Sequence, residues 1–243
     1  MARIWPEVES NRESLVEIIN TAYGPMMVPR FDSIQTYHLK TSGRAPTHDL
    51  LEVIKEEINK CDRKPVFIDI GANIGVYSVA LAPLCKLVFA FEPDYFMFNI
   101  LCANVALSGL DNIYTYNFML GKNFGMASQP KVDYSKYGNF GNIVWQPEYD
   151  SININNNCRS YAIIRPVDAC FEQIMFTENA LMKIDVEGME MEVLEGAKIF
   201  IGQYKPVLFI EHTTVGIEKL KFWADMNKYD TQILSHDVVC RPQ

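Results

Sequence analysis

Hydrophobic residues follow a helical spacing early in the chain and then change to short continuous runs. Apolar positions between Leu50 and Ile58 recur at the period of a helix and predict an amphipathic helix there. A shorter helix is expected over residues 10–21, where apolar residues follow Ser and Asn as candidate caps. We therefore expect residues 1–60 to form an N-terminal helical lead-in that covers a pocket, and residues 61–243 to form the main domain.

From residue 65 onward, predicted strands and helices alternate. The strands are continuous apolar runs, which are typical of parallel strands covered by helices on both faces. This pattern predicts an α/β fold built on a parallel sheet. The predicted strands are residues 65–70, 87–91, 113–118, 181–186 and 207–210.

The alternation fails between residues 119 and 176. Apolar residues there form short segments separated by polar turns, over residues 125–132, 138–144 and 159–167. We expect an inserted β segment at this place, with an Asn-rich surface loop over residues 151–157.

Composition and charge narrow the class of protein. Of the 243 residues, 49% are hydrophobic, which is enough for a core and excludes wholesale disorder. The 22 basic and 30 acidic residues give a net charge of −8, which argues against a general nucleic-acid binder. The apolar runs are far shorter than a membrane span, and the N-terminus lacks a signal-peptide pattern, so a cytoplasmic protein is expected. The six cysteines contain no CxxC pair and are expected to be reduced thiols.

The segment at residues 66–76 combines a buried strand, a glycine-bearing turn and the start of a helix. Gly71 and Gly75 allow a sharp turn and a close approach of the backbone to a ligand. In an open α/β sheet, ligands bind outside the carboxyl ends of the strands, which is where this turn lies. Asn73 occupies the second glycine position of the dinucleotide fingerprint, and Asp69 would repel a diphosphate.

Carboxylates near this turn favour a cationic ligand that contains a nucleoside. Asp69 attracts the sulfonium and ammonium groups of S-adenosylmethionine, in contrast to a pyrophosphate. Glu92 ends the second strand 21 residues after Gly71 and can accept hydrogen bonds from both ribose hydroxyls. Each feature alone fits a plain strand–helix turn, a solvated carboxylate or a helix cap. The three together predict a nucleoside-containing ligand.

Two later strands also end in groups that can act in catalysis. Asp185 and Glu187 end the strand that begins at residue 181, and Glu211 and His212 end the strand at residues 207–210. In a parallel sheet, these groups meet the glycine-bearing turn at one rim. The candidate catalytic residues are Asp185, Glu211 and His212, because carboxylates and imidazoles are the side chains that most often act as general bases. His38 in the lead-in is an alternative base, and capping or solvation is the structural alternative for each group.

Three motifs carry a resemblance to a known family. They are residues 67–75 (Phe-Ile-Asp-Ile-Gly-Ala-Asn-Ile-Gly), 91–94 (Phe-Glu-Pro-Asp) and 183–190 (Lys-Ile-Asp-Val-Glu-Gly-Met-Glu). With them the chain resembles the FkbM family of S-adenosylmethionine-dependent methyltransferases over roughly residues 23–212. Residues 165–168 resemble the family's short element before the later strand, with Val167 in place of the usual Leu.

The resemblance implies a Rossmann-like class I methyltransferase fold. This fold has a mostly parallel seven-stranded sheet with helices on both faces and an antiparallel last strand, and residues 229–234 and 236–239 would supply its closing strands. The resemblance also implies which residues bind the cofactor, S-adenosyl-L-methionine. These are Asp69, Gly71, Asn73 and Glu92, with Gly75 completing the turn and Asn117 or Phe118 bordering the adenine.

Members of the family mostly methylate oxygen, so the expected reaction is methyl transfer to a hydroxyl of a sugar, a glycan or a small metabolite. The oxygen must be aligned with the methyl carbon and the sulfur, and a base must take its proton. A metal-free reaction is expected, with a divalent metal held by Asp185 and Glu187 as the alternative. A non-catalytic cofactor-binding partner protein and an NAD-dependent oxidoreductase are the alternative functions. Residues 133–142 and 151–157 are expected to govern substrate choice.

Overall fold

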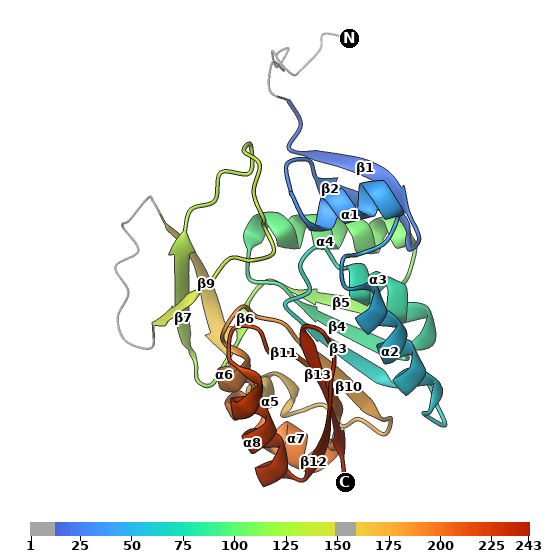
Figure 1. Ribbon diagram of the computed structural model, residues 1–243, viewed down its shortest axis with the longest axis vertical. Coiled ribbons are helices and arrows are strands. Elements are labelled where there is room, and N and C mark those ends of the chain that lie inside the picture. The colour runs from blue at the N-terminus through green and yellow to red at the C-terminus, as the bar shows by residue number, and fades with distance from the viewer. Residues whose placement is uncertain (1–12, 149–158) are drawn as a thin grey trace.

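A central β-sheet organises the protein, whose computed structural model describes residues 13–148 and 159–243 (Figure 1). Within these residues the sheet contains seven strands. Their bounds are β3 (Val66–Ile70), β4 (Leu87–Phe91), β5 (Ile113–Tyr116), β10 (Ala180–Ile184), β11 (Val207–Glu211), β12 (Tyr229–Ile233) and β13 (Asp237–Pro242). They lie in the spatial order β12-β13-β11-β10-β3-β4-β5.

The direction in which the chain winds reverses between β3 and β10. Neighbouring strands from β5 through β4, β3 and β10 to β11 are parallel. β13 runs antiparallel to both β11 and β12. Crevices at the carboxyl ends of the strands beside such a reversal are where open α/β sheets bind ligands. The α/β fold predicted from the sequence is confirmed.

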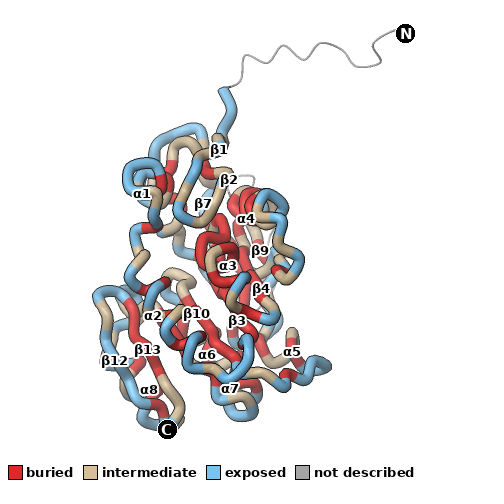
Figure 2. Tube along the Cα trace, turned by 90° about the vertical axis from the view of Figure 1, so that its right-hand side faces the viewer, coloured by how far each residue is buried: buried red, intermediate tan, exposed pale blue. Residues whose placement is uncertain are grey.

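Helices cover both faces of the sheet because strand residues alternate between two hydrophobic cores. Phe67 of β3 is buried on one face, and its neighbours Val66 and Ile68 are buried on the other. Figure 2 shows buried residues running along the central strands and exposed residues along the outer loops. The Phe67 face is covered by α2 (His48–Asn59), α3 (Val76–Leu81), the 3-10 helix η1 (Ala82–Leu84) and α4 (Tyr95–Ser108). The opposite face is covered by α5 (Val167–Phe171), α6 (Glu190–Gly196), α7 (Lys198–Tyr204) and α8 (Ile217–Asn227).

The lead-in begins with a β-hairpin and not with a helix. β1 (Val16–Thr21) and β2 (Gly24–Pro29) pair antiparallel around a turn in which Gly24 has a φ of 102°. The helix predicted over residues 10–21 is therefore wrong over its described part, because β-branched residues favour a strand once a partner strand is present. The helices of the lead-in, α1 (Gln35–Ser42) and α2, follow the hairpin. The domain boundary at residue 60 stays a prediction.

The hairpin packs onto α4, which fixes the lead-in to the main domain. Met26 and Val28 of β2 are buried in the same core as residues of α4. The Asn104 side chain accepts a hydrogen bond from the Met27 amide at 2.6 Å. It also donates to the carbonyl oxygens of Met27 at 3.0 Å and Ile74 at 2.8 Å. One buried amide side chain therefore joins the hairpin, α4 and the glycine-bearing turn.

The inserted segment forms a second sheet beside the central one, to its left in Figure 1. The predicted strand over residues 138–144 is wrong, because β7 pairs with β9 and β8, and residues 138–144 form a loop. The predicted Asn-rich loop over residues 151–157 lies outside the described residues. The strands, in the spatial order β6-β9-β7-β8, are β6 (Met119–Leu120), β9 (Arg159–Arg165), β7 (Gly125–Pro130) and β8 (Gln146–Glu148).

Two further observations concern membrane-spanning helices and cysteines. No helix within residues 13–148 and 159–243 is long and apolar enough to cross a bilayer. The five cysteines in these residues are free thiols.

Candidate active site

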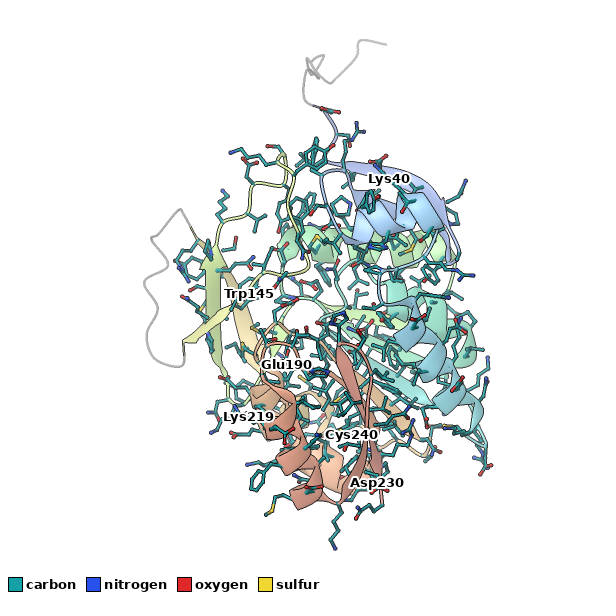
Figure 3. The ribbon with its side chains drawn as sticks, viewed as in Figure 1. Lys40, Trp145, Glu190, Lys219, Asp230 and Cys240 are labelled. Carbon is teal, nitrogen blue, oxygen red and sulfur yellow. The ribbon has the colours of Figure 1, made fainter. Side chains whose placement is uncertain are left out.

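A cavity of about 500 Å³ lies at the carboxyl ends of β3, β4, β10 and β11. Its walls come from these strand ends, from residues between 34 and 47 of the lead-in, and from residues 139–143 and Trp145 of the inserted segment. Trp145 and Glu190, both labelled in Figure 3, lie where the inserted segment meets the central sheet. Segments far apart in the sequence therefore enclose the place where the fold class binds ligands.

Asp32 joins the lead-in to the loop at residues 138–140. Its side chain is buried, and Oδ1 accepts hydrogen bonds from the amides of Ile34 at 3.1 Å and Thr36 at 2.9 Å. Oδ2 accepts from the amide of Phe140 at 3.0 Å. A backbone bridge between Asp32 and Gly138 lies beside this contact. One carboxylate thus holds together two walls of the cavity.

Glu92 lines the cavity and fixes the turn that follows β3. Its Oε2 accepts a hydrogen bond from the Asn73 amide at 2.8 Å, and its Oε1 accepts from the Asp94 amide at 2.8 Å. Asn73 has a φ of 52°, and its own Oδ1 accepts from the Ile74 amide at 2.7 Å. Burial raises the pKa of Glu92 to about 8. The carboxyl group therefore has unused lone pairs facing a cavity in a poorly solvated place.

Asp69 lies behind the turn and does not line the cavity. Its side chain is fully buried, and Oδ2 accepts a hydrogen bond from the Ser78 hydroxyl of α3 at 2.6 Å. Oδ1 is buried without a hydrogen-bond partner among the described residues. Burial raises the pKa of Asp69, against the opposing effect of Lys183. Asp69 therefore fixes α3 to β3, and its predicted contact with the cofactor stays a prediction.

Gly71 and Gly75 are required by packing within the protein. Gly71 has a φ of 81°, and a Cβ built there would lie 1.8 Å from the carbonyl oxygen of Asp185. Gly75 has a φ of 84°, and a Cβ there would lie 2.4 Å from Leu101 Cδ1 of α4. Gly71 lines the cavity, whereas Gly75 does not. The glycines therefore bring β10 and α4 close to the turn, in addition to any contact with a ligand.

Of the two residues predicted beside the adenine, Phe118 lines the cavity and Asn117 does not. The Asn117 side chain donates hydrogen bonds to the carbonyls of Glu92 at 2.9 Å and Pro93 at 3.1 Å. The guanidinium carbon of Arg165 lies 5.0 Å from the centre of the Phe118 ring. Asn117 therefore supports the end of β4, and Phe118 presents an aromatic ring to the cavity.

The other end of the cavity is acidic. Asp185 forms an ion pair with Lys183, whose Nζ lies 2.9 Å from Oδ2 and 4.8 Å from the centre of the Tyr77 ring. Burial opposes the charge of Lys183, but Asp185 and Asp69 outweigh it and raise the lysine pKa. Burial, together with Asp185, raises the pKa of Glu187 to about 8.

Glu190 stabilises the backbone at this acidic end of the cavity. It is fully buried, and its Oε1 accepts hydrogen bonds from the amides of Val186 at 3.2 Å and Gly188 at 3.1 Å. These bonds close the turn in which Glu187 has a φ of 53°. Glu190 therefore fixes the backbone that presents Glu187 to the cavity.

Glu211 lines the cavity, but its neighbour His212 does not. The Glu211 carboxylate accepts hydrogen bonds from the hydroxyls of Thr213 and, at 3.1 Å, Thr214. The His212 amide donates to the carbonyl of His236 at 2.9 Å, and it is the exposed His236 that reaches the cavity. The structure therefore brings Asp185 and Glu211 together but leaves His212 outside, and the alternative base His38 lies outside as well.

Several lining residues were missed from the sequence. Asp237 is the first residue of β13, which runs antiparallel to β11. The amino end of β13 therefore lies at the rim formed by the carboxyl ends of β10 and β11. The antiparallel closing strand expected from the family resemblance was the signal that could have found it. The expected cover from the lead-in and the loop expected at residues 133–142 named no individual lining residues. The missed residues include Thr47, Tyr77, Gln129, Ile143, Trp145, Lys183, Thr213, Thr214 and Asp237.

A family comparison gives the context for this cavity. Residues 69–235 match the model of the methyltransferase FkbM domain. The chain belongs to this family. The match contains the turn after β3, Glu92, Asp185 and Glu211, so the FkbM domain includes the strand ends that form the cavity.

Solved structures similar to this FkbM domain are distant in sequence. The methyltransferase FkbM from Methylobacillus flagellatus KT is 18% identical, with 73% of this chain and 43% of that chain covered and a TM-score of 0.49. Precorrin-6y C5,15-methyltransferase from Geobacter metallireducens GS-15 is 10% identical, with 79% and 85% covered and a TM-score of 0.47. The M. jannaschii tRNA m1G37 methyltransferase is 10% identical, with 96% and 58% covered and a TM-score of 0.49. A search of curated proteins gave no match.

S-adenosylmethionine is the cofactor of this FkbM domain. The donor set fits it, because Glu92 and Asp185 line the cavity on either side of the turn after β3. Among the described residues, Lys183 is the one lysine or arginine in the cavity wall, and Asp185 already pairs with it. Such a wall attracts a sulfonium and an ammonium and disfavours a pyrophosphate.

Proposed function

We propose that this chain is an S-adenosylmethionine-dependent methyltransferase that methylates a hydroxyl of a sugar, a glycan or a small metabolite. The proposal depends on one observation. In this FkbM domain, three carboxyl groups line the same cavity, with Glu92 at one end and Asp185 and Glu211 at the other. The first carboxylate suits a ribose, and the other two suit an acceptor that must lose a proton.

Glu92, Asn73 and Phe118 form the cofactor end of the cavity in this proposal. Both Glu92 oxygens already accept one backbone hydrogen bond, and each has a further lone pair for a ribose hydroxyl. The amides of Asn73 and Asp94 hold the carboxylate in place, so no side-chain ordering is needed when the ribose binds. Phe118 offers an aromatic face to the adenine.

Asp185 and Glu211 are the proposed proton acceptors. When bound, S-adenosylmethionine supplies an electrophilic methyl group and departs as a neutral thioether. The protein must align the acceptor oxygen with the methyl carbon and take the hydroxyl proton as the new bond forms. Asp185 is held by Lys183 at 2.9 Å, and Glu211 is held by two threonine hydroxyls. Both carboxylates therefore have fixed positions from which to accept the proton.

The experiment combines cofactor binding with methyl transfer. Calorimetry with S-adenosylhomocysteine and with NAD is expected to show binding of the first and none of the second. A screen with radiolabelled S-adenosylmethionine against sugars, glycans and small alcohols is then expected to label an acceptor. Binding without transfer to any acceptor would favour the non-catalytic alternative. Activity that a chelator abolishes and a divalent metal restores would favour the metal-assisted route.

A further inference from the structure

The acceptor end of the cavity contains more carboxyl groups than the proposed chemistry needs. Asp185, Glu187, Glu211 and Asp237 all line it. Lys183 compensates for Asp185, and the cofactor brings a single net positive charge. Two carboxyl groups are therefore left over at the place where the acceptor would bind.

Asp237 is the clearest case of a carboxyl group without a partner. The residue is 5% exposed and lines the cavity, and its carboxylate accepts no hydrogen bond from the described residues. Burial raises its pKa to about 6, against the opposing effect of Lys183. Burying a carboxylate without a partner is unfavourable, so a cation bound in the cavity would stabilise it.

Other groups that line the cavity are also suited to a cation. Glu211 is held by two threonine hydroxyls, and Glu187 is held by a turn that Glu190 closes. Trp145 also lines the cavity and offers an aromatic ring for a cation. Among the described residues, the basic side chains that line the cavity are His236 and Lys183, and Lys183 is already paired with Asp185. An anionic acceptor therefore finds no unpaired lysine or arginine there.

We propose that the acceptor carries a protonated amine near the hydroxyl that is methylated, and that Asp237 and Glu187 bind this amine. The acceptor class is thus an amino alcohol or an amino sugar, and phosphorylated or carboxylated acceptors are excluded. This inference rests on the proposed function, because it names the acceptor for the same cavity.

The test compares matched pairs of acceptors in the presence of saturating S-adenosylhomocysteine at pH 7. The pairs are ethanolamine with ethylene glycol and glucosamine with glucose, and glucose 6-phosphate serves as the anionic probe. In at least one pair, calorimetry is expected to show the amine binding at least about tenfold more tightly, as expected for a hydrogen-bonded charge pair. The phosphate is expected not to bind. Equal or weaker binding of the amine in both pairs would overturn the proposal.

Substitutions of the lining carboxyl groups test whether they cause the preference for the amine. Asp237→Asn is expected to abolish the amine preference while S-adenosylhomocysteine binds as before, and Glu187→Gln is expected to reduce the preference. The control is Asp230→Asn, because Asp230 is exposed on β12 and its Oδ1 accepts a hydrogen bond from Gln243 at 2.9 Å, away from the cavity. A preference that persists in both cavity variants would overturn the proposal. Failure of S-adenosylhomocysteine to bind the unmodified protein would instead contradict the proposed function.

Discussion

Replacing Gly71 with alanine tests whether the turn after β3 and the end of β10 form one packed unit. The new Cβ would lie 1.8 Å from the carbonyl oxygen of Asp185 and 2.9 Å from its carbonyl carbon. Both atoms belong to the backbone, so no side-chain rotation can relieve the clash. The strand end that presents the Asp185 side chain to the cavity must move.

Two contributions lower the free energy of unfolding in Gly71→Ala. A φ of 81° costs a residue with a Cβ about 1–2 kcal/mol. Overpacking against fixed atoms costs about 1–3 kcal/mol more. The expected loss of unfolding free energy is therefore about 2–5 kcal/mol, a large part of the about 5–15 kcal/mol that stabilises an ordinary domain.

Gly109→Ala is the matched control for this substitution. Gly109 ends α4 with a φ of 66°, and a Cβ built there meets no atom within 4 Å. It therefore has the backbone contribution, about 1–2 kcal/mol, without the clash. Urea unfolding measures both variants, and calorimetry with S-adenosylhomocysteine is expected to show weakened binding in Gly71→Ala alone. A Gly71→Ala variant as stable as Gly109→Ala would refute the close approach of the turn to β10.

Three further predictions follow from individual contacts. Glu92→Gln places an amide group against the Asn73 or Asp94 amide and is expected to weaken S-adenosylhomocysteine binding about 10- to 100-fold in calorimetry, whereas unchanged affinity would contradict the ribose role. The pKa of Glu92 is raised from 4.5 to about 8, so the folded state holds an extra proton between these values and stability falls as pH rises through them. Urea unfolding between pH 5 and 8 is expected to show a flatter loss in Glu92→Gln than in the unmodified protein, and parallel curves would contradict the raised pKa. Asp32→Ala removes the acceptor of the Phe140 amide and is expected to speed hydrogen exchange over residues 138–145, with a stability loss of about 1–3 kcal/mol; unchanged exchange would contradict the joining role of Asp32.

The sheet is predictable where the sequence pattern is local. The predicted strand at residues 207–210 is observed as β11, Val207–Glu211, because a continuous apolar run between polar ends has one buried arrangement in this fold. The segment at residues 10–21 is different. The β-branched residues of β1 are compatible with either structure, and pairing with β2 decides in favour of the strand. That pairing depends on residues beyond the window from which the helix was inferred.

The strand-end rule predicted part of the site and failed within two pairs of adjacent residues. Side chains alternate in direction along an extended chain, so neighbours at a strand end can point to different sides. Glu211 lines the cavity and His212 does not, and the same holds for Phe118 and Asn117. The sequence shows that both members of each pair lie at the rim. Which member turns inward depends on the register of the folded strand.

The two ends of the cavity differ in how the chain builds them. At the proposed cofactor end, Glu92 and Asn73 are 19 residues apart and follow the neighbouring parallel strands β4 and β3, so their contact follows from the α/β pattern itself. The wall formed by the lead-in and the inserted loop joins Asp32 to Phe140 across 108 residues. The buried Asp32 carboxylate accepts amides from both segments there, beside a backbone bridge to Gly138. Sequence motifs therefore indicate the cofactor, whereas the enclosure of the proposed acceptor site depends on two segments that only folding brings together. Substitutions in these segments can change the acceptor while the contacts of Glu92 stay in place.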